Sequence, residues 1–282
     1  MKTIYVTDLD GTLLNDKSEI STRSKMLLNE LASKGALITF ATARTPATVV
    51  EIFKGVELNL PGIVMTGAAT YDLRKNKYGN MKFLDKEVAV KALEIFSHYD
   101  ISPFVYSWYP GNILHAFHPD DIREHEKSFY ELRRDKRLKQ FHIGEKPEEW
   151  ALEHALLIFS IAERKDLEPV TLTLSDAIGY PVSYYNDIIS PNHGFIEIFG
   201  KDVSKASAIL ELKKELSAER VVVFGDNLND IPMFSVADLS VAVENSFPEV
   251  KEKADIVVGN NIDDSVMEYI YKDYTEGNGM AE

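Results

Sequence analysis

The 282-residue sequence contains no cysteine, which excludes disulfide bonds and metal sites built from thiolates. It also has no apolar stretch close to the roughly 20 residues that a membrane-spanning helix needs. Two aspartates appear within the first ten residues, so the amino terminus does not have the form of a secretory signal peptide. These absences together predict a cytoplasmic protein with no membrane partner.

Basic side chains are also scarce, with 31 lysines and arginines against 45 acidic residues and a formal net charge of -14. Proteins that bind nucleic acids usually carry a basic footprint. The densest basic run here, residues 133–137, lies in a polar stretch that is typical of a solvated helix surface. We therefore expect no nucleic-acid partner. An acidic protein that handles a phosphate has to neutralise its own field locally, which points to a bound cation.

Short apolar runs alternate with helices at both ends of the chain. Runs of strand length lie at residues 3–7, 36–41, 63–65, 221–224, 239–243 and 256–258. Helices are predicted between them, from Ser21 as an N-cap, from Thr45 with proline at the first helical position, and from Ser204. This alternation is typical of a parallel sheet covered by helices.

The middle of the chain differs, because helices there mix with strands of hairpin type. Residues 104–108 and 113–117 flank a turn-forming Tyr-Pro-Gly-Asn segment. We interpret this region as a second domain inserted into the first. The sequence therefore predicts an α/β protein with a Rossmann-like parallel-sheet core in residues 1–80 and 188–282, and an α/β insertion in residues 81–187.

Two carboxylates, Asp8 and Asp10, follow the first apolar run, and Gly11 permits a sharp exit of the chain. Ligands of open parallel sheets bind outside the carboxyl ends of the strands, so both side chains lie where a site would form. At about 4 Å and an effective dielectric constant near 20, the two charges repel by roughly 4 kcal/mol unless a cation lies between them. The alternative is that one aspartate caps the next turn and the other is solvated.

A second acidic segment, residues 225–230, follows the apolar run at 221–224. It brings Asp226 and Asp230 to what should be the same edge of the sheet. Four carboxylates there call for a hard cation with oxygen ligands, and Mg²⁺ suits that best. The alternative is a helix amino terminus capped by Asn229 or Asp230, which leaves Asp226 unexplained.

Lys205 and Thr42 are two further candidates. A lysine in the first turn of a helix opposes the helix dipole by about 0.3–1 kcal/mol, so Lys205 makes sense if a phosphate or an aspartate lies close to it. A surface lysine is the alternative. Thr42 ends the second apolar run and precedes Ala43 and Arg44, so its hydroxyl and the following N–H groups could hold phosphate oxygens. A plain turn residue is the alternative for Thr42.

These segments together resemble the haloacid dehalogenase superfamily, specifically the Cof-type phosphatases with a large inserted cap. The resemblance covers nearly the whole core, and its first and last catalytic motifs are highly specific together. It is carried by residues 8–14, 40–44, 67–68, 71–72, 203–205, 225–230, 237–238 and 254–255. For the cap it rests on position and size only, and it implies that residues 81–187 set substrate specificity.

The resemblance implies a role for each matching residue. Asp8 would attack phosphorus and form an aspartyl-phosphate, and Asp10 would protonate the leaving oxygen and then activate water. Lys205 would pair with Asp8 and with the phosphoryl group, and Thr42 would bind that group as a fourth catalytic residue. The implied phosphate-binding residues are Asp8, Thr42, Ala43, Lys205 and Asn229.

The resemblance also implies Mg²⁺ as a cofactor. Asp8, the main-chain carbonyl of Asp10 and Asp226 would bind it. Asn229 and Asp230 would complete its environment through hydrogen bonds or water. This agrees with the interpretation from the residues alone, in which positioning and charge neutralisation do most of the work.

The chain departs from the family pattern at four positions. Ala43, Ala206 and Ser265 stand where the family usually or often has glycine, and Thr66 stands where it usually has asparagine. None of these differences removes a charged catalytic group. They bear on the shape of the substrate pocket and not on the phosphoryl chemistry.

The expected reaction is hydrolysis of a small phosphomonoester such as a sugar phosphate. A phosphomutase of related chemistry and a non-catalytic sensor of a phosphorylated metabolite are the alternatives. Trp108, Tyr109, His115 and His118 could contact a sugar, or the aromatic rings could pack the cap while the histidines are exposed. We expect a monomer or a weak homodimer whose partner is a small phosphorylated metabolite.

Overall fold

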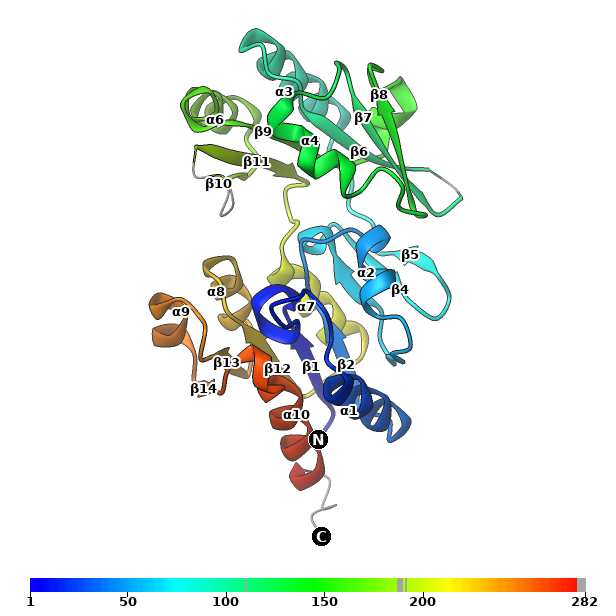
Figure 1. Cartoon of the computed structure of the whole chain (residues 1–282), viewed down its shortest axis with the longest axis vertical. Coiled ribbons are helices and arrows are strands. Elements are labelled where there is room, and N and C mark those ends of the chain that lie inside the picture. Colours follow the sequence, from blue (N-terminus) through cyan, green and yellow to red (C-terminus); the bar gives the residue numbers. More distant parts are fainter. Residues whose placement is uncertain (110, 187–189, 191, 278–282) are drawn as a thin grey trace. The chain divides into compact units, whose positions relative to one another are not determined.

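The computed structural model describes residues 1–109, 111–186, 190 and 192–277. The chain divides into two compact units (Figure 1). We call residues 1–79 with 204–282 the core unit and residues 80–203 the inserted unit. Both are α/β, so the expected fold class is confirmed.

The insertion extends to Val203 rather than to Asp187, which itself lies outside the described residues. The reason is the strand β11 (His193–Phe199), which pairs antiparallel with β9 (Ala155–Glu163) along its whole length. β11 therefore belongs to the inserted unit, because its hydrogen bonds run to the sheet of that unit. The sequence pattern shows the strand but not its partner, and the expected boundary was therefore too early.

The core unit is built on a five-stranded parallel sheet in the order β14-β13-β12-β1-β2. Its strands are β1 (Thr3–Thr7), β2 (Leu37–Phe40), β12 (Arg220–Gly225), β13 (Leu239–Val243) and β14 (Ile256–Val258). β1 lies between β12 and β2, with Val6 opposite Val223 on one side and Thr39 on the other. Such strands are buried on both faces and are therefore almost continuously apolar.

Helices cover both faces of this sheet (Figure 1). Those that share an apolar cluster with Val6 and Val223 are α7 (Lys205–Glu215), α8 (Ile231–Phe234) and α9 (Pro248–Lys253). The opposite face carries the pair α1 (Thr22–Ser33) and α10 (Ser265–Gly277), with Tyr269 of α10 against Phe224. α1 begins as expected at Ser21, whose hydroxyl accepts a hydrogen bond from the N–H of Ser24 at 2.9 Å.

A small antiparallel sheet extends the core unit beyond β2. It consists of β3 (Gly62–Val64), β4 (Ala69–Asp72) and β5 (Lys77–Gly79), and α2 (Pro46–Ile52) connects it to β2. A single parallel bridge from Ala41 to Ile63 joins it to the main sheet.

The inserted unit contains a six-stranded sheet in the order β10-β11-β9-β6-β7-β8. The remaining strands are β6 (Phe104–Tyr109), β7 (Ile113–His118), β8 (Lys139–Ile143) and β10 (Val182–Asn186). The expected hairpin of β6 and β7 is present, although Pro110 in its turn lies outside the described residues. All neighbours are antiparallel except β7 and β8.

Helices also pack on both faces of the six-stranded sheet. The helices α3 (Lys86–His98), α5 (Glu149–Glu153) and α6 (Arg164–Ile178) share the apolar cluster of one face. On the other face, Phe129 of α4 (Glu124–Glu131) contacts Phe104 and Phe159. Across the described parts of both units, no helix combines the length and the apolar character that crossing a membrane requires.

Candidate active site

The carboxyl ends of three neighbouring strands bring the expected site residues to one edge of the core sheet. The N–H of Asp8 donates to the carbonyl of Phe224 in β12 at 2.9 Å, and the N–H of Ala41 after β2 donates to the carbonyl of Thr7 at 2.9 Å. Asp8 therefore lies between the segment that leads to Thr42 and the segment that leads to Asp226. The motifs thus meet at the carboxyl ends of the strands, where ligands of open parallel sheets bind.

A buried chain of charges joins Asp8, Lys205 and Asp230. The ammonium group of Lys205 lies 2.6 Å from Oδ1 of Asp8 and 2.7 Å from Oδ1 of Asp230. The three residues are 7%, 4% and 0% exposed. The second oxygen of Asp230 accepts hydrogen bonds from the N–H groups of Asp226 and Asn227, each at 3.1 Å. Asp230 is thus fully engaged, and its carboxylate positions Lys205 and the start of the loop after β12.

The position of Lys205 depends on the amino terminus of α7 and on one glycine. Ser204 and Ser207 form a reciprocal capping box, with the N–H of Ser207 donating to the Ser204 hydroxyl at 2.9 Å. Gly67 has a φ of 98°, and a Cβ atom there would lie 2.3 Å from the carbonyl oxygen of Ser204. Only glycine allows this close approach and this backbone conformation together, so Gly67 lets the start of α7 reach the site.

The carboxylate of Asp226 contacts the turn that directly follows Asp8 at two residues, Thr12 and Gly11. The Thr12 hydroxyl donates to Oδ1 of Asp226 at 2.7 Å. Gly11 has a φ of 76°, and a Cβ atom there would lie 2.4 Å from Oδ2 of the same carboxylate. Sequence reasoning assigned Thr12 no role, although its place directly after Gly11 in the first acidic motif was a usable signal.

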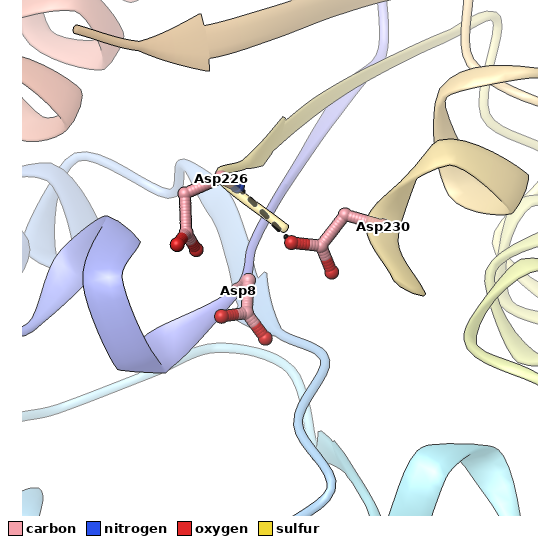
Figure 2. Close-up of side chains that lie close together, drawn as sticks. All are labelled: Asp8, Asp226 and Asp230. Atoms are coloured by element: carbon pink, nitrogen blue, oxygen red, sulfur yellow. Dashed lines mark hydrogen bonds between the residues drawn. The ribbon is translucent and has the colours of Figure 1, made fainter. Parts of the chain in front are cut away.

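The three carboxylates lie close together (Figure 2), and the charge of Lys205 does not cancel theirs. Asp8, Asp226 and Asp230 with Lys205 carry -3 + 1 = -2 when all are ionised. Burial raises the pKa of Asp8 to about 8 with further help from Asp230 and Asp226, although Lys205 acts in the opposite direction. Burial also raises the pKa of Asp226 to about 6. Burial alone would lower the pKa of Lys205, but Asp8 and Asp230 raise it, so the lysine stays charged.

A divalent cation fits this surplus of negative charge. Asp8, Asp226 and Asp230 each offer one oxygen, and these atoms lie within 4.8 Å of one another. Since both oxygens of Asp230 already accept hydrogen bonds, Asp8 and Asp226 are the two carboxylates left to bind an ion. Oxygen-only ligands with two net negative charges suit Mg²⁺.

Asp10 lies apart from the buried cluster. Its carboxylate is 53% exposed and forms a two-point ion pair with Arg44, with distances of 2.7 Å to Nε and 2.5 Å to Nη2. Hydrogen bonding to Asp10 raises the pKa of Arg44. The N–H of Arg44 also donates to the Thr42 hydroxyl at 3.1 Å. Arg44 therefore connects two expected site residues, a function that sequence reasoning did not assign to it.

The remaining candidates for phosphate binding differ in their positions. Thr42 is buried at the sheet edge. Ala43 next to it is exposed, and its N–H makes no hydrogen bond to any described residue, so it can donate to an oxygen of a ligand. Asn229 is exposed as well, and its side chain makes no hydrogen bond within the described part of the chain. The structure thus brings Asp8, Lys205, Asp226 and Asp230 together.

Three of the four ring-bearing candidates of the inserted unit, Tyr109, His115 and His118, take part in its packing. The rings of Tyr109 and His115 contact Trp150, and Nδ1 of His115 lies 2.9 Å from Nε2 of His142. His118 is fully buried, and its two ring nitrogens lie 2.7 Å and 3.0 Å from main-chain carbonyl oxygens. The alternative in which the rings pack is supported, but the exposure expected for His118 was wrong. Trp108 is half-buried.

Comparisons with known proteins agree over nearly the whole chain. A family profile described as haloacid dehalogenase-like hydrolase matches residues 5–270. The 5-amino-6-(5-phospho-D-ribitylamino)uracil phosphatase YcsE of Bacillus subtilis is 26% identical over 267 residues, which cover 93% of this chain and 92% of that protein. The pyridoxal phosphate phosphatase YbhA of Escherichia coli is 23% identical, with coverage of 95% and 97%. The crystal structure of TM0651 from Thermotoga maritima is similar with a TM-score of 0.76 at 27% identity, covering 96% and 97% of the two chains.

Proposed function

This chain belongs to the haloacid dehalogenase-like hydrolases and is a phosphatase, and we propose that it uses Asp8 as a nucleophile and Mg²⁺ as a cofactor to hydrolyse a small phosphorylated metabolite. The observation that carries the proposal is the buried chain of Asp8, Lys205 and Asp230 beside Asp226, which has two negative charges left over when all four groups are ionised. A site with this surplus is suited to a divalent cation and a phosphoryl group that arrive together.

In the proposed reaction, Asp8 attacks with the oxygen that Lys205 leaves free. Lys205 binds Oδ1, and no described residue donates to Oδ2. A bond forms between Oδ2 and phosphorus while the bond from phosphorus to the leaving oxygen breaks, and the electron pair departs with that oxygen. Water then attacks phosphorus, which releases inorganic phosphate and restores the Asp8 carboxylate. A bound Mg²⁺ would neutralise charge so that a carboxylate can approach a phosphate.

Binding of the phosphoryl group falls to the residues whose donors point to the same edge. Lys205 brings a permanent positive charge, because its pKa is raised by Asp8 and Asp230 although burial opposes this. Ala43 offers a free N–H and Thr42 a hydroxyl. Asn229 was also expected to take part, and its exposed side chain makes no hydrogen bond to another described residue that would prevent this.

Asp10 is proposed as the general acid and base, but both of its carboxylate oxygens are bound by Arg44. It therefore has to leave Arg44 and take up a proton before it can protonate a leaving oxygen. Asp10→Asn should slow the hydrolysis of sugar phosphates by about 10²–10⁴-fold, the usual range for general acid catalysis. Nitrophenyl phosphate should lose less, because its leaving group needs no proton. Equal losses in kcat/KM on both substrates would contradict the acid role.

The proposed substrate is a sugar phosphate or a similar small phosphomonoester. The names of two relatives specify a phosphoribitylamino compound and pyridoxal phosphate, which share a phosphomonoester on a compact polar body. A net charge of -14 disfavours a polyanion. We propose further that the inserted unit sets specificity and that the protein is a monomer or a weak homodimer.

The test compares wild type with Asp8→Asn on a panel of phosphorylated metabolites, a phosphopeptide and a 5′-phosphorylated oligonucleotide. We expect release of free phosphate from several small substrates, dependent on Mg²⁺, and a loss of at least about 10²-fold in Asp8→Asn at an unchanged melting temperature. Tenfold better kcat/KM on either macromolecule would contradict the proposed substrate class. An isomerised sugar phosphate without free phosphate would indicate a mutase instead.

A further inference from the structure

We propose that Asn245 is a positioning residue for the Mg²⁺ site, acting through the turn of residues 9–14. The inference rests on the proposed function and names a further residue of that site. Asn245 follows β13 and lies outside every motif that carried the family resemblance. Its role is derived from hydrogen bonds that tie the loop after β13 to the turn after β1.

Two asparagine side chains hold this turn from outside. Nδ2 of Asn245 donates to the carbonyl of Gly11 at 2.7 Å, and Oδ1 of Asn245 accepts from the N–H of Asn261 at 3.0 Å. Nδ2 of Asn261 in turn donates to the carbonyl of Leu14 at 2.7 Å. The carbonyl groups of Gly11 and Leu14 are thus both fixed by one connected pair of side chains, which we call the asparagine clamp, Asn245 with Asn261.

The clamp acts at the point where the turn has the most freedom. Gly11 has a φ of 76°, and glycine rotates there with little steric penalty. The peptide that joins Gly11 to Thr12 sets the direction of the Thr12 hydroxyl, which donates to Asp226 at 2.7 Å. Fixing the Gly11 carbonyl therefore fixes the group that orients one of the two carboxylates left to bind an ion. The preceding peptide carries the carbonyl of Asp10, so its direction is restricted as well.

Asn29 in α1 provides a matched control in the same unit. Its Nδ2 donates to the carbonyl of Gly55 at 3.0 Å, and its Oδ1 accepts from the N–H of Glu57 at 2.8 Å. Both asparagines thus tie an exposed glycine carbonyl and an N–H group, but Asn29 ties the loop after α2. If Asn245 only stabilises a loop, Asn245→Ala and Asn29→Ala should behave alike.

The experiment measures Mg²⁺ binding apart from turnover. For Asn245→Ala we expect the Mg²⁺ concentration that gives half of the thermal shift, and half of the activity, to rise about threefold to tenfold, as for one lost hydrogen bond. kcat should fall, and KM for the phosphorylated substrate should change less than twofold. Asn245→Gln keeps the amide and should recover part of the loss. Asn29→Ala should lower the melting temperature without changing either Mg²⁺ midpoint.

A double-mutant cycle with Thr12→Val tests the path. If Asn245 acts through Thr12, the increases in the Mg²⁺ midpoint for Asn245→Ala and Thr12→Val will not multiply in the double variant. Multiplying factors, or equal Mg²⁺ midpoints for Asn245→Ala and wild type, would overturn the inference. An inactive wild type would instead refute the proposed function, and the thermal-shift titration would still decide the role of Asn245.

Discussion

Lys205 in the core unit and Lys139 in the inserted unit are buried to nearly the same extent, at 4% and 6% exposure. The groups that contact them differ in charge. Lys205 contacts two carboxylates, whereas Lys139 donates to the Tyr106 hydroxyl at 2.9 Å and lies over the rings of Tyr106 and Phe141. Burial lowers the pKa of Lys139 well below 10.5, with Arg133 adding to the effect, while the pKa of Lys205 is raised.

The comparison shows which buried charges indicate a bound ligand and which are neutralised within the protein. Among the other buried charges of the inserted unit, His118 lies 3.4 Å from Glu126. Burial lowers the pKa of His118, but Glu126 and the Asp120 carbonyl outweigh this and raise it, so that pair cancels. Lys139 favours its neutral form, because burial in surroundings of low dielectric constant disfavours the charged form. Among the described residues, the carboxylate cluster around Lys205 keeps a surplus of negative charge that the surrounding side chains do not neutralise, and we propose that the chemistry takes place there.

The largest effect should come from Lys205→Met. The change leaves the carboxylates of Asp8 and Asp230 buried without their cation, which usually costs about 3–5 kcal/mol. Urea unfolding at pH 7 should show this loss, together with loss of turnover. Lys213→Met on the same helix is the control, because its pair with Asp238 is partly exposed and should be worth less than about 1 kcal/mol. Equal stabilities of the two variants would show that the buried cluster does not depend on Lys205.

Gly11→Ala should have the next largest effect. A Cβ atom at Gly11 would lie 2.4 Å from the Asp226 carboxylate, and alanine would have to adopt the φ of 76° that Gly11 has. Gly179→Ala is the matched control, since Gly179 has a φ of 66° with nothing within 4 Å. We expect about 1 kcal/mol lost at Gly179, the usual penalty at such a position, and more at Gly11 together with weaker Mg²⁺ binding. Equal losses in both variants would mean that the contact with Asp226 carries no energy.

The double variant Lys139→Met with Tyr106→Phe should be as stable as wild type at pH 7 or more so, by about 1 kcal/mol, because both polar partners leave together. The folded pKa of Lys139 lies below its unfolded value of 10.5, so the unfolded chain binds more protons between these two values. Wild-type stability therefore falls as pH falls through that window. The advantage of the variant should be larger at pH 7 than at pH 10, and thermal unfolding at both values checks this. The opposite trend would mean that Lys139 is charged in the folded state.

The smallest effect is expected from Thr66→Asn, at the edge where the N–H of Thr66 donates to the carbonyl of Thr42 at 2.9 Å. Thr66 has a φ of 57°, which a β-branched residue adopts with strain and asparagine tolerates better. Relief of that strain should raise stability by about 0.5 kcal/mol and leave turnover within twofold. Destabilisation in chemical unfolding would mean that Thr66 makes contacts worth more than its strain.

The carboxylate cluster could be predicted from the sequence, because its aspartates follow buried strands. Asp8 and Asp226 follow neighbouring parallel strands, so the strand pattern places them at one edge of the sheet. Lys205 begins a helix, and its pairing with Asp8 was expected only from the family resemblance. The direction of Asp10 was not open to prediction. Its ion pair depends on Arg44, which is far away in the sequence and whose side chain is placed by tertiary structure.

The clamp residues and the second boundary of the insertion were missed for a related reason. Asn245 and Asn261 are surface polar residues with no periodic or capping pattern that marks them as partners of Gly11 and Leu14. The boundary at Val203 depends on which strand pairs with β11. Local patterns give the elements, but long-range pairing gives the partners.

Isothermal titration of the wild-type chain with Mg²⁺ at pH 7, beside Asp226→Asn and the double variant of Lys139 and Tyr106, tests the central claim most directly. The two negative charges that Asp8, Asp226, Asp230 and Lys205 carry when all are ionised predict one bound ion per chain. Asp226→Asn should weaken binding by at least about tenfold, the loss of roughly 1.4 kcal/mol or more, and the double variant should bind as wild type does. Absence of binding to wild type, or equal affinity in Asp226→Asn, would contradict the account.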